Sequence, residues 1–111
     1  MRVKTNLDPY FDKMKLEDMN LLWSVMVDMK HYVRSMQHII EKGVTDRPAD
    51  EAEKITDFAK HNLEFYAKNV DEFMLAYGME SLFGTDKKEK LADEDYKYII
   101  ARYYYLMSEP E

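Results

Sequence analysis

The chain has 111 residues, of which 46% are hydrophobic and 34% are charged, and its net charge is -6. The acidic balance argues against nucleic acid as the main partner, because phosphate binding needs clustered lysine and arginine. The chain has no cysteine, which excludes disulfides, thiolate metal sites and thiol nucleophiles.

The sequence also lacks the signals that direct a chain to a membrane. No apolar run approaches the roughly 18 residues of a membrane span. The N-terminal residues contain no apolar stretch of the kind found in signal peptides. We therefore expect a cytoplasmic protein with no membrane partner.

Residues 1–15 are expected to form a short N-terminal arm. Asp8 followed by Pro9 is typical of a helix N-cap with proline at the first helical position. This pair predicts a short helix or turn over about residues 9–14.

A first long helix is predicted over residues 16–42. Seven apolar residues follow an unbroken alternation of three-residue and four-residue steps: Met19, Leu22, Met26, Met29, Val33, Met36 and Ile40. This spacing forms a single stripe along a helix that packs against another helix. Gly43 is expected to end the helix, with Lys42 in its last turn.

A second long helix is predicted over residues 47–77, ending before Gly78. Its core stripe is Ala52, Ile55, Ala59, Leu63, Tyr66, Val70, Phe73 and Tyr77. Each long helix measures roughly 40 Å at 1.5 Å per residue. The short link between two helices of similar length predicts an antiparallel hairpin.

A third, shorter helix is predicted over residues 87–108. Its second half is apolar or aromatic nearly all round, with Lys97 and Arg102 as interruptions. Such a helix is buried on more than one side or faces a partner. The predicted fold is therefore a single all-α domain over residues 1–111, an oligomerising three-helix bundle built from the hairpin and this C-terminal helix.

Five metal-competent residues on the two long helices raise the question of a metal site: Asp28, His31, Asp57, His61 and Glu64. Because the predicted turn lies near residue 45, His31 and His61 should lie at similar heights. They point, however, about 160–180° away from the apolar stripes. We therefore expect exposed histidines and no cofactor. A metal site would need a third helix or a second subunit to cover that outer surface.

Other chemistry finds little support in the sequence. Glycine-rich phosphate loops and nucleophile elbows are absent. The acidic run Asp93, Glu94 and Asp95 is typical of a helix N-terminus, where the helix dipole favours negative charge. We therefore expect no catalytic residues and no enzymatic activity.

The more informative feature is the amount of apolar surface. A third helix of about 20 residues spans only about 30 Å and cannot cover every remaining apolar side chain of two 40 Å helices. Phe58 and Phe65 form a second stripe with two amides beside the main one; the alternative is that the third helix covers this flank. The residues predicted to contact a partner are Trp23, Phe58, Asn62, Phe65, Asn69, Tyr98, Tyr103, Tyr104 and Tyr105.

Uncovered apolar surface rich in aromatic residues and methionine is typical of protein interfaces. The sequence therefore predicts a small acidic interaction module that binds another protein, itself included. It could serve as an accessory subunit, an assembly factor or a regulatory inhibitor such as phages encode. The alternative hypothesis is a metal-binding helical bundle or bundle enzyme that uses the five metal-competent residues across an oligomer face.

Overall fold

The computed structural model describes residues 4–111, which contain α-helices and one short 3₁₀-helix but no strand. In chain order the elements are α1 (Asp8–Phe11), α2 (Leu16–Lys42), α3 (Ala49–Ala76), η1 (Thr85–Lys87) and α4 (Asp93–Met107). The all-helical fold expected from the sequence is confirmed. Within the described residues, no helix combines the length and apolar content that crossing a bilayer requires.

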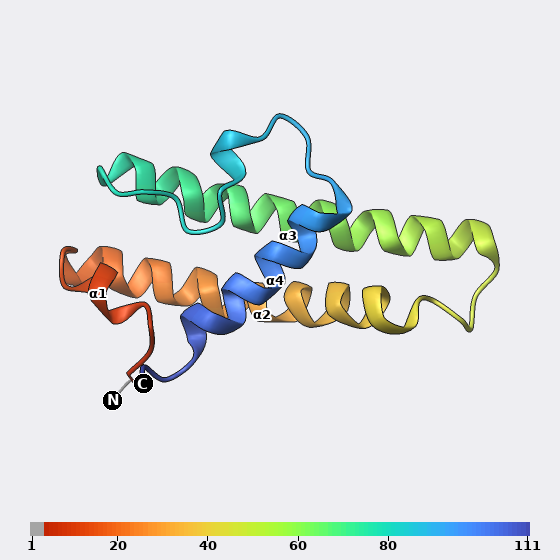
Figure 1. Ribbon diagram of the computed structural model, residues 1–111, viewed down its shortest axis with the longest axis horizontal. Helices are drawn as coiled ribbons and strands as arrows, with labels where there is room; N and C mark the ends of the chain where they lie inside the picture. The colour runs from red at the N-terminus through yellow and green to blue at the C-terminus, as the bar shows by residue number, and fades with distance from the viewer. Residues whose placement is uncertain (1–3) are drawn as a thin grey trace.

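The helices α2 and α3 lie side by side and run antiparallel, and the connection at residues 43–48 lies at one end of the molecule (Figure 1). The observed bounds of α2 agree with the predicted ones. Gly43 stops the helix because its φ of 71° lies in the left-handed region, which glycine adopts without steric strain. Its N–H still donates to the carbonyl of Ile39, at 2.8 Å.

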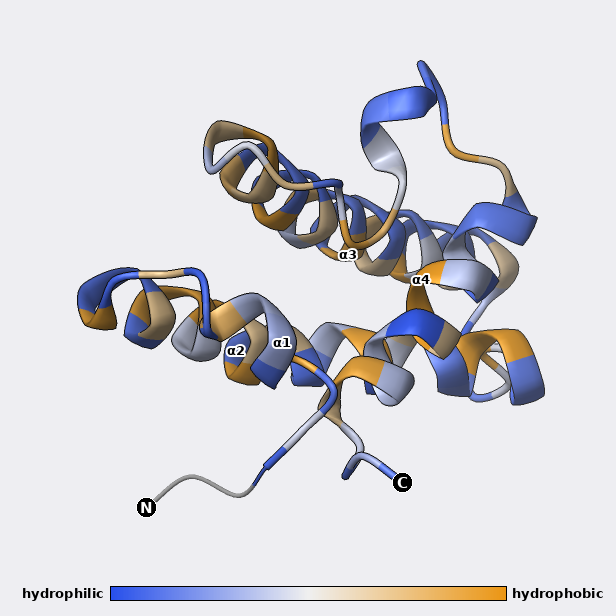
Figure 2. Cartoon of the chain, turned by 60° about the vertical axis from the view of Figure 1, so that its left-hand side comes forward, coloured by the Kyte–Doolittle hydropathy of each residue, from blue (hydrophilic) through white to orange (hydrophobic). Residues whose placement is uncertain are grey.

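The two long helices pack through their predicted stripes, and Figure 2 shows hydrophobic and hydrophilic bands alternating along both. The buried residues of this interface are Leu22, Met26, Met29, Val33 and Met36 on α2, and Ala59, Leu63, Ala67, Val70 and Met74 on α3. Long methionine side chains from one helix combine with alanines from the other. Such a mixture of long and small side chains allows two layers to interdigitate.

The predicted stripes are not buried along their whole length. Ile40 is 38% exposed and Ile55 is 39% exposed, although both lie in line with the core residues of their helices. Figure 1 gives the reason: the turn end of the hairpin extends beyond the point where α4 crosses it. A stripe position is buried only where another element covers its margins.

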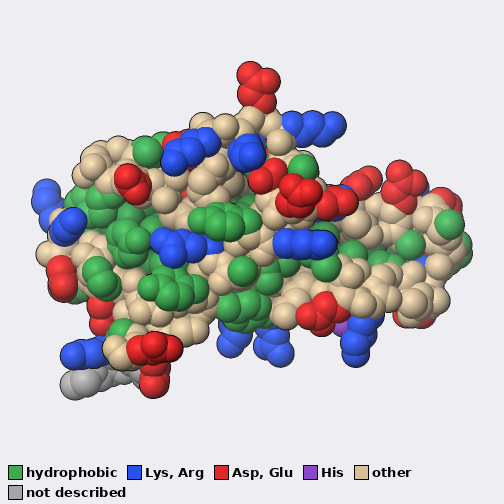
Figure 3. All heavy atoms as spheres, in the orientation of Figure 1, with side chains coloured by type: hydrophobic (Ala, Val, Ile, Leu, Met, Phe, Trp, Pro, Cys, Tyr) green, Lys and Arg blue, Asp and Glu red, His purple; other side chains and the backbone are tan. Residues whose placement is uncertain are grey.

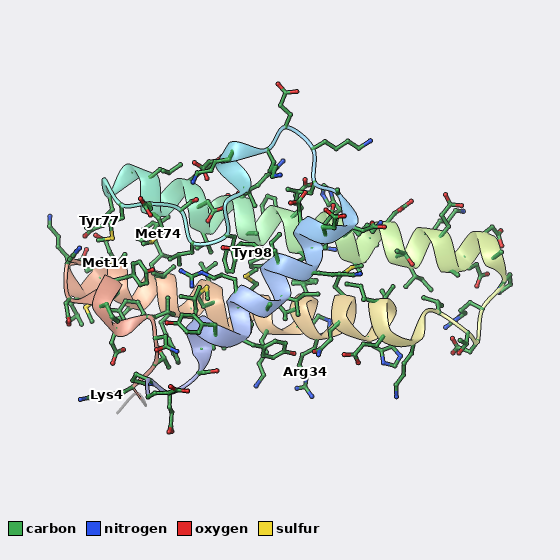
Figure 4. The ribbon with its side chains drawn as sticks, in the orientation of Figure 1. Lys4, Met14, Arg34, Met74, Tyr77 and Tyr98 are labelled. Atoms are coloured by element: carbon green, nitrogen blue, oxygen red, sulfur yellow. The ribbon has the colours of Figure 1, made fainter. Side chains whose placement is uncertain are left out.

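The opposite end of the hairpin is closed by Tyr77, which follows α3 (Figure 4). Its hydroxyl donates to the carboxylate of Asp18 at 2.5 Å and accepts the N–H of Lys15 at 3.1 Å. The hydrogen bond with Asp18 raises the pKa of Tyr77, because the bond favours the neutral phenol. The C-terminal end of α3 is thus tied to the N-terminal end of α2.

The last helix, α4, begins at Asp93 and not near residue 87 as predicted. The preceding segment forms η1 and then extends, since Lys88 has φ -126° and ψ 132°. The start of α4 is fixed by Asp95, whose carboxylate accepts the N–H of Ala92 at 2.7 Å. The helix crosses the hairpin obliquely (Figure 1) and buries Tyr96, Ile99, Ile100, Tyr103 and Leu106 against it.

The loop before α4 is anchored on α3 by a fully buried carboxylate, that of Asp71. It accepts the backbone N–H of Phe83 and that of Thr85, both at 2.8 Å, and the hydroxyl of Thr85 forms a third bond. This anchor holds the loop in a non-helical path across α3. It explains why the segment does not join α4.

The N-terminal arm is part of the packed structure. Asp8 is the first residue of α1 and Leu7 occupies the N-cap position, so the prediction of Asp8 as the cap is wrong. Leu7 and Phe11 are buried in the core. The backbone N–H of Asn6 donates to the carbonyl of Ser108 at 3.0 Å, which holds the arm against the residue that follows α4.

Candidate interaction surface

One side of the α2–α3 hairpin is covered by the rest of the chain, and Figure 1 shows α1 and α4 crossing in front of it. On α2, Gln37 accepts the hydroxyl of Tyr104 from α4 at 2.6 Å. On α3, Lys60 pairs with Asp93 of α4 at 3.1 Å. We call this the covered side.

The reverse side of the hairpin presents different residues. On α2, Gln37 points to the covered side. The side chain of Tyr32 points about 140° away from that of Gln37, counted at about 100° per residue. Tyr66 lies about 120° round α3 from Lys60 by the same count. The side chains that share this reverse side, which we call the open face, are Leu21, Val25, Asp28, Tyr32, Ile39, Ile55, Phe58, Asn62, Phe65, Tyr66, Asn69 and Phe73.

Large apolar side chains on the open face lie in contact with solvent. Phe58 is 67% exposed, Phe65 is 58% exposed and Leu21 is 53% exposed. Burying a side chain of this size contributes about 1.5–3 kcal/mol relative to leaving it in water. The alternative expectation, that the third helix covers the Phe58 and Phe65 flank, is therefore wrong: α4 packs on the covered side.

Aromatic contacts hold the centre of the open face in a fixed arrangement. The rings of Tyr32 and Tyr66 stack between the two helices, with centroids 5.2 Å apart and planes 29° apart. Phe65 meets Tyr66 edge-on at 6.0 Å, and His31 meets Tyr32 edge-on at 5.2 Å. Aromatic pairs of this kind contribute about 0.5–1.5 kcal/mol beyond the area they bury. The exposed rings are thus positioned on rigid helices before any partner arrives.

The centre of the open face carries few charges, and its ends carry more. Asp28 lies among the apolar residues of α2, whereas on α3 the exposed Glu51 lies in line with Asn69 and the exposed Glu72 lies about 20° round the helix from Phe65. The polar groups among its apolar residues are mainly amides: Asn62 lies between the two exposed phenylalanines and donates to the carbonyl of Phe58 at 2.9 Å. Depletion of charge and enrichment of aromatic residues are the features that distinguish interface cores from ordinary protein surface.

The residues predicted to contact a partner do not share one surface. Phe58, Asn62, Phe65 and Asn69 lie together on the open face. Trp23 lies instead on the covered side, where its ring packs edge-on against Phe11 of α1 at 6.5 Å. The predicted set therefore divides between the two sides of the hairpin.

Tyr103 belongs to the core and not to an exposed surface. It is 1% exposed, and its hydroxyl donates to the backbone carbonyl of Met26 at 2.8 Å. Burial raises the pKa of Tyr103 to about 12, because the ionised phenolate would lose its hydration. The neighbouring Tyr104 points outward and is 38% exposed.

The outer surface of α4 carries Tyr98 and Tyr105, each 55% exposed. The guanidinium of Arg102 lies over the ring of Tyr105 at 5.3 Å and also donates to the carbonyl of Leu82 at 3.2 Å. Figure 3, which shows this side of the molecule, has hydrophobic groups interspersed with both signs of charge. The exposed rings of α4 are therefore dispersed among charges, in contrast to those of the open face.

The five residues of the metal hypothesis are not brought together within the chain. In residues 4–111, no group of three or more histidine and carboxylate side chains is placed to hold a metal ion. Glu64 pairs with Lys68 at 3.4 Å, and the ring of His31 packs against Tyr32. Asp57 and His61 are exposed on α3.

A hollow of about 760 Å³ lies at the turn end of the hairpin. Its walls include Ile39 and Ile55 of the open face, together with Arg34 and Arg47. The sequence does not predict this hollow, because the hollow depends on the path of the connecting loop. The sequence predicts Tyr66 as a core residue of the second long helix, but it does not predict that Tyr66 stacks on Tyr32 at the margin of the open face.

Comparison of the chain with protein-family models, with curated proteins and with solved structures finds no match. Function is therefore inferred from the surface itself. The centre of the open face combines exposed aromatic rings and few charges on a support of two packed helices.

Proposed function

We propose that this chain is a protein–protein interaction module that binds through its open face. The observation that carries the proposal is the exposure of Phe58 and Phe65 beside the packed Tyr32–Tyr66 pair. The elements α1 and α4 contact the other side of the hairpin. They leave these rings unshielded.

The physical basis of binding is the removal of this apolar surface from water. Burial of Phe58, Phe65 or Leu21 would contribute about 1.5–3 kcal/mol per side chain to the binding free energy, before the entropic cost of association is subtracted. The rings are already ordered by helix packing and by aromatic contacts, so little further ordering is needed. Pre-organisation of this kind increases affinity for a given contact area.

The proposed role is binding without a reaction of its own. An accessory subunit, an assembly factor and a regulatory inhibitor all act through such a binding event. Each would use a rigid apolar surface that is complementary to one partner, with polar groups such as Asn62 and Asn69 to select it. Buried amides of this kind fix register at some cost in stability.

A pair of double variants tests the proposal. Phe58→Glu with Phe65→Glu places two charges on the open face, while Tyr98→Glu with Tyr105→Glu places two charges on the outer surface of α4. We expect the wild-type chain and the α4 variant to form the same complex. This complex is either a homo-oligomer or a complex with a protein captured from the native host. The open-face variant should lose that complex while its circular dichroism remains helical.

Three outcomes would contradict the proposal. Retention of every complex by the open-face variant would show that binding does not involve this surface. Unfolding of that variant, together with unfolding of the milder Phe65→Ser, would show that the flank belongs to the core of the chain. A complex lost only in the α4 variant would move the binding surface to the covered side.

A further inference from the structure

We propose that the occupant of the open face is a second copy of this chain. Two copies pack open face to open face across a two-fold axis, so that α2 and α3 of both form a four-helix core. This inference rests on the proposed binding role and adds the identity of the partner and the register of the contact.

The size of the open face matches what a stable dimer needs. Helices of this length, 27 and 28 residues, extend over roughly 40 Å at 1.5 Å per residue. Two helices at an interaxial distance of about 10 Å present a width of roughly 20 Å. The resulting area, roughly 800 Å² per copy, equals the share of each partner in an interface of standard size.

The sequence of α3 is self-complementary about Asn62. When two copies of α3 lie antiparallel with the axis at this residue, Phe58 of one copy faces Phe65 of the other. Asn62 then faces its own counterpart. An amide carries both donors and an acceptor, so two copies of the same side chain can bond to each other. Identical charges in that position would repel.

The sequence of α2 fits the same axis. The connection at residues 43–48 makes the middle of α2 level with Asn62. Two antiparallel copies of α2 then place Leu21 opposite Ile39 and Asp28 opposite the hydroxyl-bearing Tyr32. The first pair is apolar on both sides. In the second pair the hydroxyl of Tyr32 can donate a hydrogen bond to the carboxylate of Asp28.

The rim of the open face carries one attractive and one repulsive kind of charge pair in this register. Glu17 and Lys42 lie within about 60° of Leu21 around the helix, on the rim of the open face. Both side chains are exposed. In the antiparallel dimer, Glu17 of one copy lies opposite Lys42 of the other, at both ends. On α3 the same register places Glu51 of one copy opposite Glu72 of the other, which is a like-charge pair, so the rim charges as a whole do not select this orientation.

The absence of cysteine from the chain allows a direct test of this geometry. Asn62→Cys places a thiol on the axis, within the distance of about 7 Å between Cα atoms that a disulfide tolerates. Asn69→Cys is the matched control: it lies on the same helix and face, but its two copies are about 14 residues apart along the bundle, or roughly 21 Å. Mild oxidation should therefore link Asn62→Cys chains into a dimer and leave Asn69→Cys chains unlinked.

Light scattering after size-exclusion chromatography gives the second readout. We expect the wild-type chain to have twice the mass of one chain at micromolar concentration, and Phe58→Glu with Phe65→Glu to have the mass of one. A wild-type chain that remains single at high micromolar concentration would overturn the inference. Equal cross-linking of Asn62→Cys and Asn69→Cys would overturn it as well, since the proposed register forbids the second.

The outcomes separate this inference from the proposed function. A single wild-type chain that binds a different protein, with the binding lost in the open-face variant, overturns the dimer and supports the binding role. A wild-type chain that forms no complex of either kind overturns both.

Discussion

The phenol of Tyr103 is buried in the core, which raises its pKa to about 12, above the value of about 10 for a free tyrosine. The folded state favours the neutral phenol, so this contribution to stability is fully present below about pH 10 and is lost as the pH rises towards 12. We predict that phenolate absorbance, measured in an alkaline titration, shows a late step in which Tyr103 ionises together with unfolding.

The variant Tyr103→Phe should remove that late step. Tyr105→Phe is the matched control, because its ring is 55% exposed and its loss should leave the late step in place. Loss of the same step in both variants would contradict the assignment of the late step to the buried phenol.

The three consecutive tyrosines illustrate the limit of prediction at the residue scale. They were predicted together as interface residues, yet Tyr103 is buried while Tyr104 and Tyr105 are exposed. Successive helical residues point about 100° apart, so one surface cannot hold all three. Which of them turns inward depends on the angle at which α4 crosses the hairpin, and that angle is a property of the tertiary packing.

At the scale of elements, the attachment of the loop to α3 depends on Asp71. We predict that Asp71→Ala lowers the free energy of unfolding by about 2–3 kcal/mol, because it leaves buried donors of the loop without a partner. Thr85→Val is the graded control: it removes the hydroxyl bond and keeps the two backbone bonds to Asp71. Urea denaturation followed by circular dichroism measures both changes, and an equal loss in the two variants would show that the backbone bonds contribute nothing.

The ends of the helices were predictable where local sequence determines them. The bounds of α2 agree with the prediction because the apolar spacing is unbroken and Gly43 adopts a positive φ. The start of α4 was predicted about six residues too early, because the lysine-rich segment before it contains good helix formers. There the hydrogen bonds that the loop donates to Asp71 override local propensity. A contact between residues this far apart in the sequence leaves no local pattern.

At the scale of the whole molecule, the chain covers its hairpin on one side. The positions of Phe58, Phe65 and the two asparagines on a common flank were predictable from helical periodicity alone. Their exposure was not, because it depends on which side of the hairpin α4 and the N-terminal arm occupy. The result is a molecule whose buried core lies towards the covered side and whose two exposed phenylalanines, Phe58 and Phe65, lie on the other side.

If the open face closes by pairing with a second copy, folding and association are linked, and thermal stability must depend on protein concentration. Each tenfold increase in concentration favours a folded dimer over two unfolded chains by about 1.4 kcal/mol. For a dimer of this size, we predict a rise in Tm of about 3 °C for each tenfold increase, measured by circular dichroism. The open-face variant, Phe58→Glu with Phe65→Glu, should melt at a Tm that does not change with concentration. A wild-type Tm that does not change with concentration would contradict the dimer. Folding would then be complete without a second copy, and Phe58 and Phe65 would remain exposed to water in the folded chain.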